Sequence, residues 1–183
     1  IEIVTGRGSV VGHELCANPD IDLITLTGST EVGIETAQVA AKTLTHTALE
    51  LGGNDAFIVM ADGDVDLATD EVIWGRMYNT GQVCCASKRF LVHESRVQEF
   101  TDKVVEKISA LKQGMPAEDD TQIGCLISEK AAIEVERQIN LTVEQGGKIV
   151  LGGKRNGAFV EPTVIVDVPA TADVAKDMEI FGP

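Results

Sequence analysis

The chain has 183 residues, of which 44% are hydrophobic and 24% are charged, a composition typical of a globular protein that buries a core. No apolar run approaches the ~20 residues that a membrane helix needs, so we expect no membrane partner. The net charge of −14, with no basic patch to offset it, would repel a phosphate backbone, so we expect no nucleic-acid partner.

Apolar runs and helical patterns alternate over the first sixty residues. Asn18-Pro19 ends the first predicted helix, and Gly52-Gly53 forms a turn between two strands. The predicted strands are 1–4, 21–27, 46–50 and 55–60, and the predicted helices are 10–17 and 30–43. This order predicts a βαβ unit in a parallel sheet, and we place a domain boundary at the glycine turn.

Glycines before the first predicted helix have the context of a phosphate-binding turn. Gly6, Gly8 and Gly12 follow a predicted strand and open a helix, where free backbone amides can bind phosphate. Their spacing is one residue longer than the common dinucleotide fingerprint G-x-G-x-x-G. A plain tight turn is therefore the alternative to a cofactor-binding turn.

Helices and strands also alternate in the second part of the chain. The predicted helices are 64–77, 95–111 and 128–145, and the predicted strands are 88–93, 148–151 and 163–168. In the helix 95–111, apolar residues recur on one face, and Ser95 with Gln98 matches a capping box. That face consists of Val97, Phe100, Val104, Ile108 and Leu111. We assign it to the core.

Cysteine and histidine spacing gives no sign of a disulfide framework or a metal site. The cysteines are Cys16, Cys84, Cys85 and Cys125, two of them adjacent, and no spacing matches a zinc site. The three histidines have no Glu or Cys at ligand spacing. We therefore predict no metal, and reduced thiols favour a cytoplasmic location.

Two residues have the chemistry for covalent catalysis. Glu50 precedes a glycine pair, and Cys84 ends a Gly-Gln-Val-Cys run. A carboxylate can act as a general base, a thiol can act as a nucleophile, and glycines let a ligand approach the backbone closely. Each residue also has a plain structural interpretation, Glu50 as a strand end and Cys84 as one of several small buried residues.

Four segments in this order resemble the aldehyde dehydrogenase superfamily. They are residues 26–33, 49–55, 81–84 and the terminal Glu-Ile-Phe-Gly-Pro run 179–183. The resemblance covers essentially the whole chain. It implies an α/β fold with a parallel sheet in three αβα layers, with the end of a Rossmann-like cofactor domain at 1–53 followed by most of the catalytic domain at 54–183.

The resemblance implies NAD(P)-dependent oxidation of an aldehyde. Cys84, near the start of a helical turn, would attack the carbonyl, and its backbone amide would stabilise the oxyanion. Hydride loss would leave a thioester on Cys84, and Glu50 would activate the water that hydrolyses it. Transfer of the acyl group to coenzyme A is the alternative. Cys85 would be a neighbour without a role in catalysis.

The resemblance also implies a cofactor site for NAD or NADP. Ser29, as the N-cap of a helix, would lie nearest the pyrophosphate, and Glu179 would bind the hydroxyls of the nicotinamide-side ribose. Phe181 would pack against the nicotinamide ring. The expected cofactor-binding residues are Gly8, Gly12, Gly28, Ser29, Glu179 and Phe181. Without the resemblance, a capping acid and a core ring would explain Glu179 and Phe181.

Family members are longer than this chain, so it resembles their middle portion. We expect the complete enzyme to be a homodimer or homotetramer that acts on a small aldehyde, and the 183 residues alone to be inactive. A non-catalytic interaction fragment is the alternative. Lys88 and Arg89 would either meet a carboxylate on the substrate or form a solvated strand start.

Overall fold

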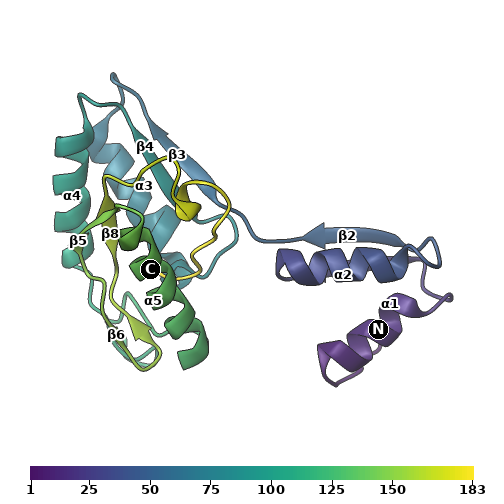
Figure 1. The fold of residues 1–183 in the computed structure, drawn as a ribbon. Helices are drawn as coiled ribbons and strands as arrows, with labels where there is room; N and C mark the ends of the chain where they lie inside the picture. Colours follow the sequence, from purple (N-terminus) through teal and green to yellow (C-terminus); the bar gives the residue numbers. More distant parts are fainter. The chain divides into compact units, whose positions relative to one another are not determined.

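A computed structural model describes all 183 residues, Ile1–Pro183. The chain divides into two compact units, Ile1–Gly52 and Gly53–Pro183 (Figure 1). Each unit contains parallel strand pairing, as the sequence predicts for an α/β fold. No helix is long and apolar enough to cross a membrane. The assignment of the two units to a cofactor domain and a catalytic domain stays a prediction.

The first unit is built around one βαβ element. Strands β1 (Leu23–Thr27) and β2 (His46–Glu50) pair in parallel, and α2 (Thr30–Ala40) connects them. Its buried residues lie on one face of α2, where the absence of a side chain on Gly33 gives room to Leu51. A π-helical turn, Gly8–Gly12, leads into α1 (His13–Ala17).

The predicted strand at 1–4 does not form. These four residues are exposed and have no strand beside them. A β-strand needs a partner to accept and donate its ladder hydrogen bonds, so β propensity alone does not produce one. The βαβ unit of the first part therefore consists of β1, α2 and β2.

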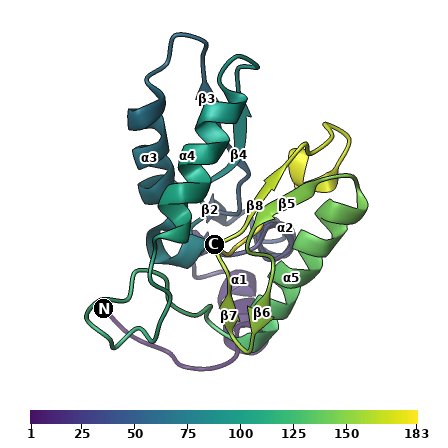
Figure 2. The same cartoon turned by 90° about the vertical axis from the view of Figure 1, so that its left-hand side faces the viewer.

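The second unit has a parallel pair covered by two helices. Strands β3 (Asp55–Val59) and β4 (Ser87–Val92) pair in parallel, while α3 (Val65–Met77) and α4 (Val97–Ser109) lie side by side against them (Figure 2). Their apolar residues form one core. Its buried members are Val59, Val65, Val72, Met77, Phe100, Val104, Ile108 and Ile123.

A second core lies under the long helix α5 (Glu129–Glu144). Strands β5 (Lys148–Leu151) and β8 (Val164–Val166) are antiparallel, and β6 (Arg155–Asn156) and β7 (Phe159–Val160) form a short hairpin that the sequence patterns miss. The parallel expectation is wrong for these strands. The β6–β7 hairpin connects β5 to β8, and no helix lies between them to form the crossover that parallel strands usually need, so the chain turns back on itself.

Two helices of the second unit begin at residues whose side chains cap them. The hydroxyl of Ser128 accepts from the Ala131 amide, and the carboxylate of Asp64 accepts from the Leu67 amide. The predicted capping box at Ser95 is wrong, because α4 begins one residue later than that cap requires, with Arg96 at its N-cap. The Ser95 hydroxyl instead lies 2.9 Å from Nδ1 of His93. Val97 is 44% exposed, so the buried face of α4 is shorter than predicted.

Candidate active site

In the first unit, three predicted site residues lie at the carboxyl edge of the strand pair. Glu50 is the last residue of β2, it is exposed, and its carbonyl accepts a hydrogen bond from the Gly28 amide at 3.0 Å. Ser29 is the N-cap of α2, and its hydroxyl accepts from the Val32 amide at 3.4 Å. Parallel strands commonly present ligand-binding residues at this edge.

The N-terminus of α2 favours negative charge. The pKa of Glu31 is lowered, first by a hydrogen bond from the backbone amide of Glu31 itself and then by the Ser29 hydroxyl. Free amides and the dipole at a helix N-terminus also attract phosphate groups. The first turn of α2 therefore favours a negatively charged group, as the predicted place of Ser29 next to the pyrophosphate requires.

The early glycines lie in a helical turn, not in a loop after a strand. Gly8 and Gly12 bound the π-helical turn, and a methyl group on either glycine would meet no other atom within 4 Å. Steric crowding therefore does not explain these two glycines. Gly6 differs, since a methyl group there would collide with Val11.

In the second unit, Cys84 lies on an exposed turn just before β4. The Ala86 amide donates to the Val83 carbonyl at 3.2 Å, and this hydrogen bond closes the turn around Cys84 and Cys85. Both thiols are exposed. The helical turn predicted at Cys84 is a single hydrogen-bonded turn, which lies between the 3₁₀ turn Tyr78–Gly81 and β4 and does not continue into a helix.

The backbone that leads into the Cys84 turn has an unusual conformation. Asn79, Thr80 and Gly81 all have positive φ angles, of 49°, 57° and 72°. Side chains of the segment secure it: the Thr80 hydroxyl accepts from the Gly124 amide at 3.0 Å, and the Gln82 side-chain oxygen accepts from the Ile127 amide at 2.8 Å. The backbone that carries Cys84 is thus tied to the loop before α5.

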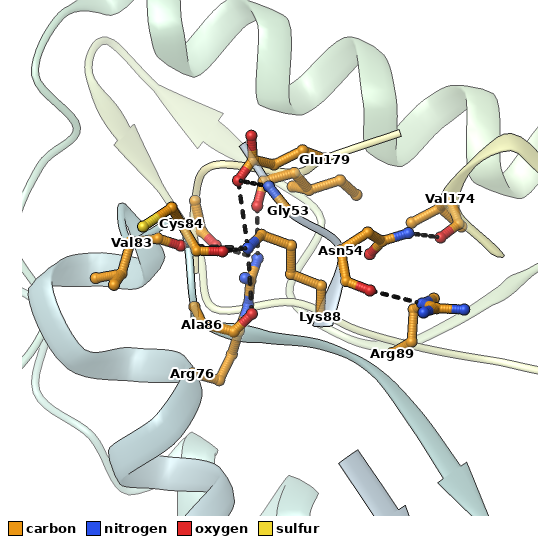
Figure 3. Close-up of polar contacts among 12 residues, drawn as sticks. Gly53, Asn54, Arg76, Val83, Cys84, Ala86, Lys88, Arg89, Val174 and Glu179 are labelled. Carbon is orange, nitrogen blue, oxygen red and sulfur yellow. Dashed lines mark hydrogen bonds and ion pairs between the residues drawn. The ribbon is translucent and has the colours of Figure 1, made fainter. Parts of the chain in front are cut away.

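Lys88 is buried directly behind the Cys84 turn. Its side chain is 1% exposed, and Nζ donates to the carbonyls of Val83, Cys84 and Ala86 at 3.2, 2.7 and 3.1 Å. Nζ also lies 3.3 Å from Oε1 of Glu179 (Figure 3). The solvated strand start does not fit Lys88, because its side chain is buried and its ammonium group is paired within the protein.

Glu179 belongs to a terminal segment that the fold brings beside the Cys84 turn. Its Oε1 accepts from the Gly53 amide at 3.1 Å, across 126 residues of sequence, and its backbone carbonyl accepts from the Gln138 side chain at 2.9 Å. Phe181 is 43% exposed, so its ring is not a core residue. Glu179 and Cys84 are therefore joined through Lys88.

Arg76 fixes the residues that follow Glu179. Its Nη2 donates to the carbonyls of Ile180 and Gly182 at 3.1 and 2.5 Å. Burial lowers the pKa of Arg76 to about 10, and the charge of Glu179 acts in the opposite direction. The Gly182 carbonyl lies so close to Gly81 that a side chain at Gly81 would collide with it.

Asn54 and Arg89 are half-buried and hold a neighbouring loop. Asn54 Nδ2 donates to the carbonyls of Val174 and Lys176, each at 2.8 Å, and Arg89 donates to the carbonyls of Asn54 and Ala175. The solvated strand start that sequence allows for Arg89 is wrong. Burying a guanidinium requires such partners.

An apolar hollow of about 670 Å³ lies along α3 and α4. Trp74 and Tyr78 line it, with ring centroids 5.1 Å apart, and both rings are more than half exposed. Aromatic surface of this kind is often used in binding. Trp74, Tyr78 and Arg76 are the residues here that sequence reasoning did not assign, since each follows an ordinary helix pattern or lies at a helix end.

Comparison with known proteins identifies a single family. Residues 1–183 match the model described as the aldehyde dehydrogenase family. The chain is 40% identical over 184 residues to an NADP(+) succinate-semialdehyde dehydrogenase of Escherichia coli and 39% identical over 183 residues to a lactaldehyde dehydrogenase of Methanococcus aeolicus. Each comparison covers 99% of this chain but 38% of the relative.

Solved structures agree with this result. A cysteine-to-alanine mutant of aldehyde dehydrogenase C from Pseudomonas syringae, crystallised with NAD+ and octanal, has a TM-score of 0.94 and 32% identity. That comparison covers 98% of this chain and 38% of the solved one. The predicted α/β, Rossmann-like fold class is confirmed.

Proposed function

Because the chain belongs to the aldehyde dehydrogenase family, we propose that the protein containing it oxidises an aldehyde to a carboxylic acid with NAD+ or NADP+. One observation carries the proposal: an exposed thiol, Cys84, lies on a turn that shares a buried lysine with Glu179. A nucleophile and a cofactor-binding carboxylate in one network suit this reaction.

Cys84 begins the reaction as the nucleophile. Its thiolate adds to the aldehyde carbonyl, and the carbon–sulfur bond forms as the carbonyl oxygen becomes an oxyanion. The backbone amide of Cys84 donates to that oxyanion. Bound NAD+ or NADP+ supplies the acceptor for the hydride that leaves when the oxyanion collapses. Cys84 is then left as an acyl thioester.

Glu50 completes the cycle as the general base. Its carboxylate takes a proton from water, and the resulting hydroxide attacks the thioester and releases the acid and the Cys84 thiolate. An exposed carboxylate at a strand end is accessible to water, which supports this role. Release of a free acid is thus favoured over transfer to coenzyme A.

The residues present fit the cofactor. Gly53 and Lys88 both bind Oε1 of Glu179, which leaves Oε2 to accept from ribose hydroxyls. Phe181 has an exposed ring to offer a flat ligand. At the other end, Ser29 and the free amides of α2 suit a pyrophosphate, with Gly28, Gly8 and Gly12 as the further predicted contacts.

The proposal extends to the organisation of the whole protein. We assign the first unit to the cofactor domain and the second to the catalytic domain. A cytoplasmic, homo-oligomeric enzyme remains the expectation from the sequence.

The test is turnover by the full-length protein. We expect reduction of NAD+ or NADP+ with propanal or succinate semialdehyde, production of the free acid, and loss of activity in Cys84→Ala. Cys85→Ala is the matched control and should retain activity. Product that appears only as a coenzyme A thioester would assign the acylating reaction, and activity that survives Cys84→Ala would refute the mechanism.

A further inference from the structure

Lys88 has more hydrogen-bond partners than a structural lysine requires. Three of its four partners are carbonyl oxygens of the single turn that carries Cys84, and the fourth is the carboxylate of Glu179. An ammonium group has three protons, and burying it is costly unless those protons are used. The geometry around Lys88 is therefore tightly specified.

The same contacts restrict the turn. Carbonyls of Val83, Cys84 and Ala86 converge on one nitrogen, so the peptide planes on both sides of Cys84 face inward. Charge-assisted hydrogen bonds of this type are shorter and stronger than neutral ones. With its carbonyls held, the turn has little freedom to reorient the thiol.

Glu179 is restricted through the same nitrogen. Lys88 and the Gly53 amide share Oε1, while Gln138 and Arg76 hold the backbone of the segment at Glu179, Ile180 and Gly182. The backbone is thus secured independently of Lys88. What Lys88 adds is the orientation of the carboxylate itself.

We propose that Lys88 is a positioning residue that couples the Cys84 turn to the Glu179 carboxylate, so that thiol and cofactor are held in one geometry. This inference rests on the proposed function and names a residue through which it operates. Lys88 does not touch the substrate. It acts through the carbonyls of the turn and through Oε1 of Glu179.

The coupling predicts two effects from one substitution. Replacing Lys88 releases the carbonyls of the turn, so the backbone that orients the Cys84 thiol is no longer held. It also frees Glu179 to rotate away from the ribose. Each effect involves the loss of a charge-assisted hydrogen bond. Such a loss lowers a rate or an affinity by roughly 10- to 100-fold.

The experiment compares Lys88→Gln with Lys148→Gln in the full-length protein with Cys85→Ala as background. Lys148 is the matched control, because it also pairs with a carboxylate, that of Asp167, but is 72% exposed. Two quantities are measured: the alkylation rate of Cys84 by iodoacetamide, and the dissociation constant of the oxidised cofactor. We expect Lys88→Gln to lower the alkylation rate and to raise the dissociation constant, each by about tenfold or more. Lys148→Gln should change neither quantity.

A double-mutant cycle separates positioning from a general loss of structure. In a Glu179→Gln background, Lys88→Gln should no longer weaken cofactor binding, because the carboxylate it orients is absent, while it should still slow alkylation. Lys88→Gln keeps an amide donor for the carbonyls, and circular dichroism checks its folding. If it does not fold, Lys88→Arg, which keeps the charge, should bind cofactor within about threefold of the wild type, a difference below 1 kcal/mol.

The outcomes distinguish this inference from the function on which it rests. Wild-type rates and affinities in Lys88→Gln, or additive effects in the cycle, would overturn the coupling while leaving the dehydrogenase intact. A wild-type protein that binds neither NAD+ nor NADP+ would overturn the proposed function itself.

Discussion

At the residue scale, the thiols differ in their access to reagents. Cys84 and Cys85 are exposed on one turn, whereas Cys16 and Cys125 are partly buried. Iodoacetamide labelling followed by peptide mapping should therefore modify Cys84 and Cys85 before Cys16 and Cys125. Preferential labelling of Cys16 or Cys125 would rule out Cys84 as the reactive thiol.

Glu50 offers a second test at this scale. In the full-length enzyme, Glu50→Gln should slow steady turnover by roughly 10²- to 10⁴-fold, the usual contribution of a general base. The first burst of reduced cofactor should survive, because the base acts after hydride transfer. Stopped-flow absorbance measures both phases. Loss of the burst together with turnover would mean that Glu50 activates the thiol instead.

At the element scale, the ends of α4 and α5 provide a matched pair of serines. Ser128 caps α5 through its hydrogen bond to the Ala131 amide, whereas Ser95 precedes α4 and caps nothing. Ser128→Ala should therefore lower the free energy of unfolding by about 1 kcal/mol. Ser95→Ala should lower it by much less, since only an exposed contact with His93 is lost.

Urea unfolding followed by circular dichroism measures the free energy of unfolding of both variants. Equal losses of stability would contradict the assigned caps. The comparison also explains the failed prediction at Ser95. A capping box requires the serine to be the N-cap itself, and one residue of displacement moves its hydroxyl out of reach of the helix amides.

At the scale of the whole molecule, the two units have very different cores. The first buries only Gly33, Thr36, Val39 and Ala40, and its single sheet has two strands. The second buries two apolar clusters. A two-stranded sheet with so small a core is marginal by itself. In limited proteolysis of the 183-residue chain, we therefore expect cleavage within Ile1–Gly52 before cleavage within Gly53–Pro183.

The 183-residue chain should also be a poor enzyme. It spans about 38% of the length of the relatives it matches. Any oxyanion donor that lies in the rest of the protein would be missing, and loss of one such donor costs ~10² to 10³ in rate. Assays of the purified chain with propanal and NAD+ or NADP+ should give negligible turnover. Turnover near the ~10 s⁻¹ median of enzymes would show that the chain is self-sufficient.

The sequence by itself determined the fold class, the family and most elements. Periodicity and helix-end residues located α3, α5 and β2 to within a residue, because those signals act between neighbours in the chain. The four ordered motifs are sufficient to indicate the family. Local patterns failed where a partner was needed, as for the strand predicted at 1–4 and the antiparallel pairing of β5 with β8.

Only the tertiary structure decided what Lys88 and Arg76 do. In sequence, Lys88 is a polar residue at the start of a strand, and Arg76 lies in the last turn of an ordinary helix. Folding brings the terminal Glu179–Gly182 segment against both, and the low exposure of Lys88 turns a charge that would be solvated into one that must be paired. Burial depends on contacts between distant segments, so no local pattern of residues encodes it.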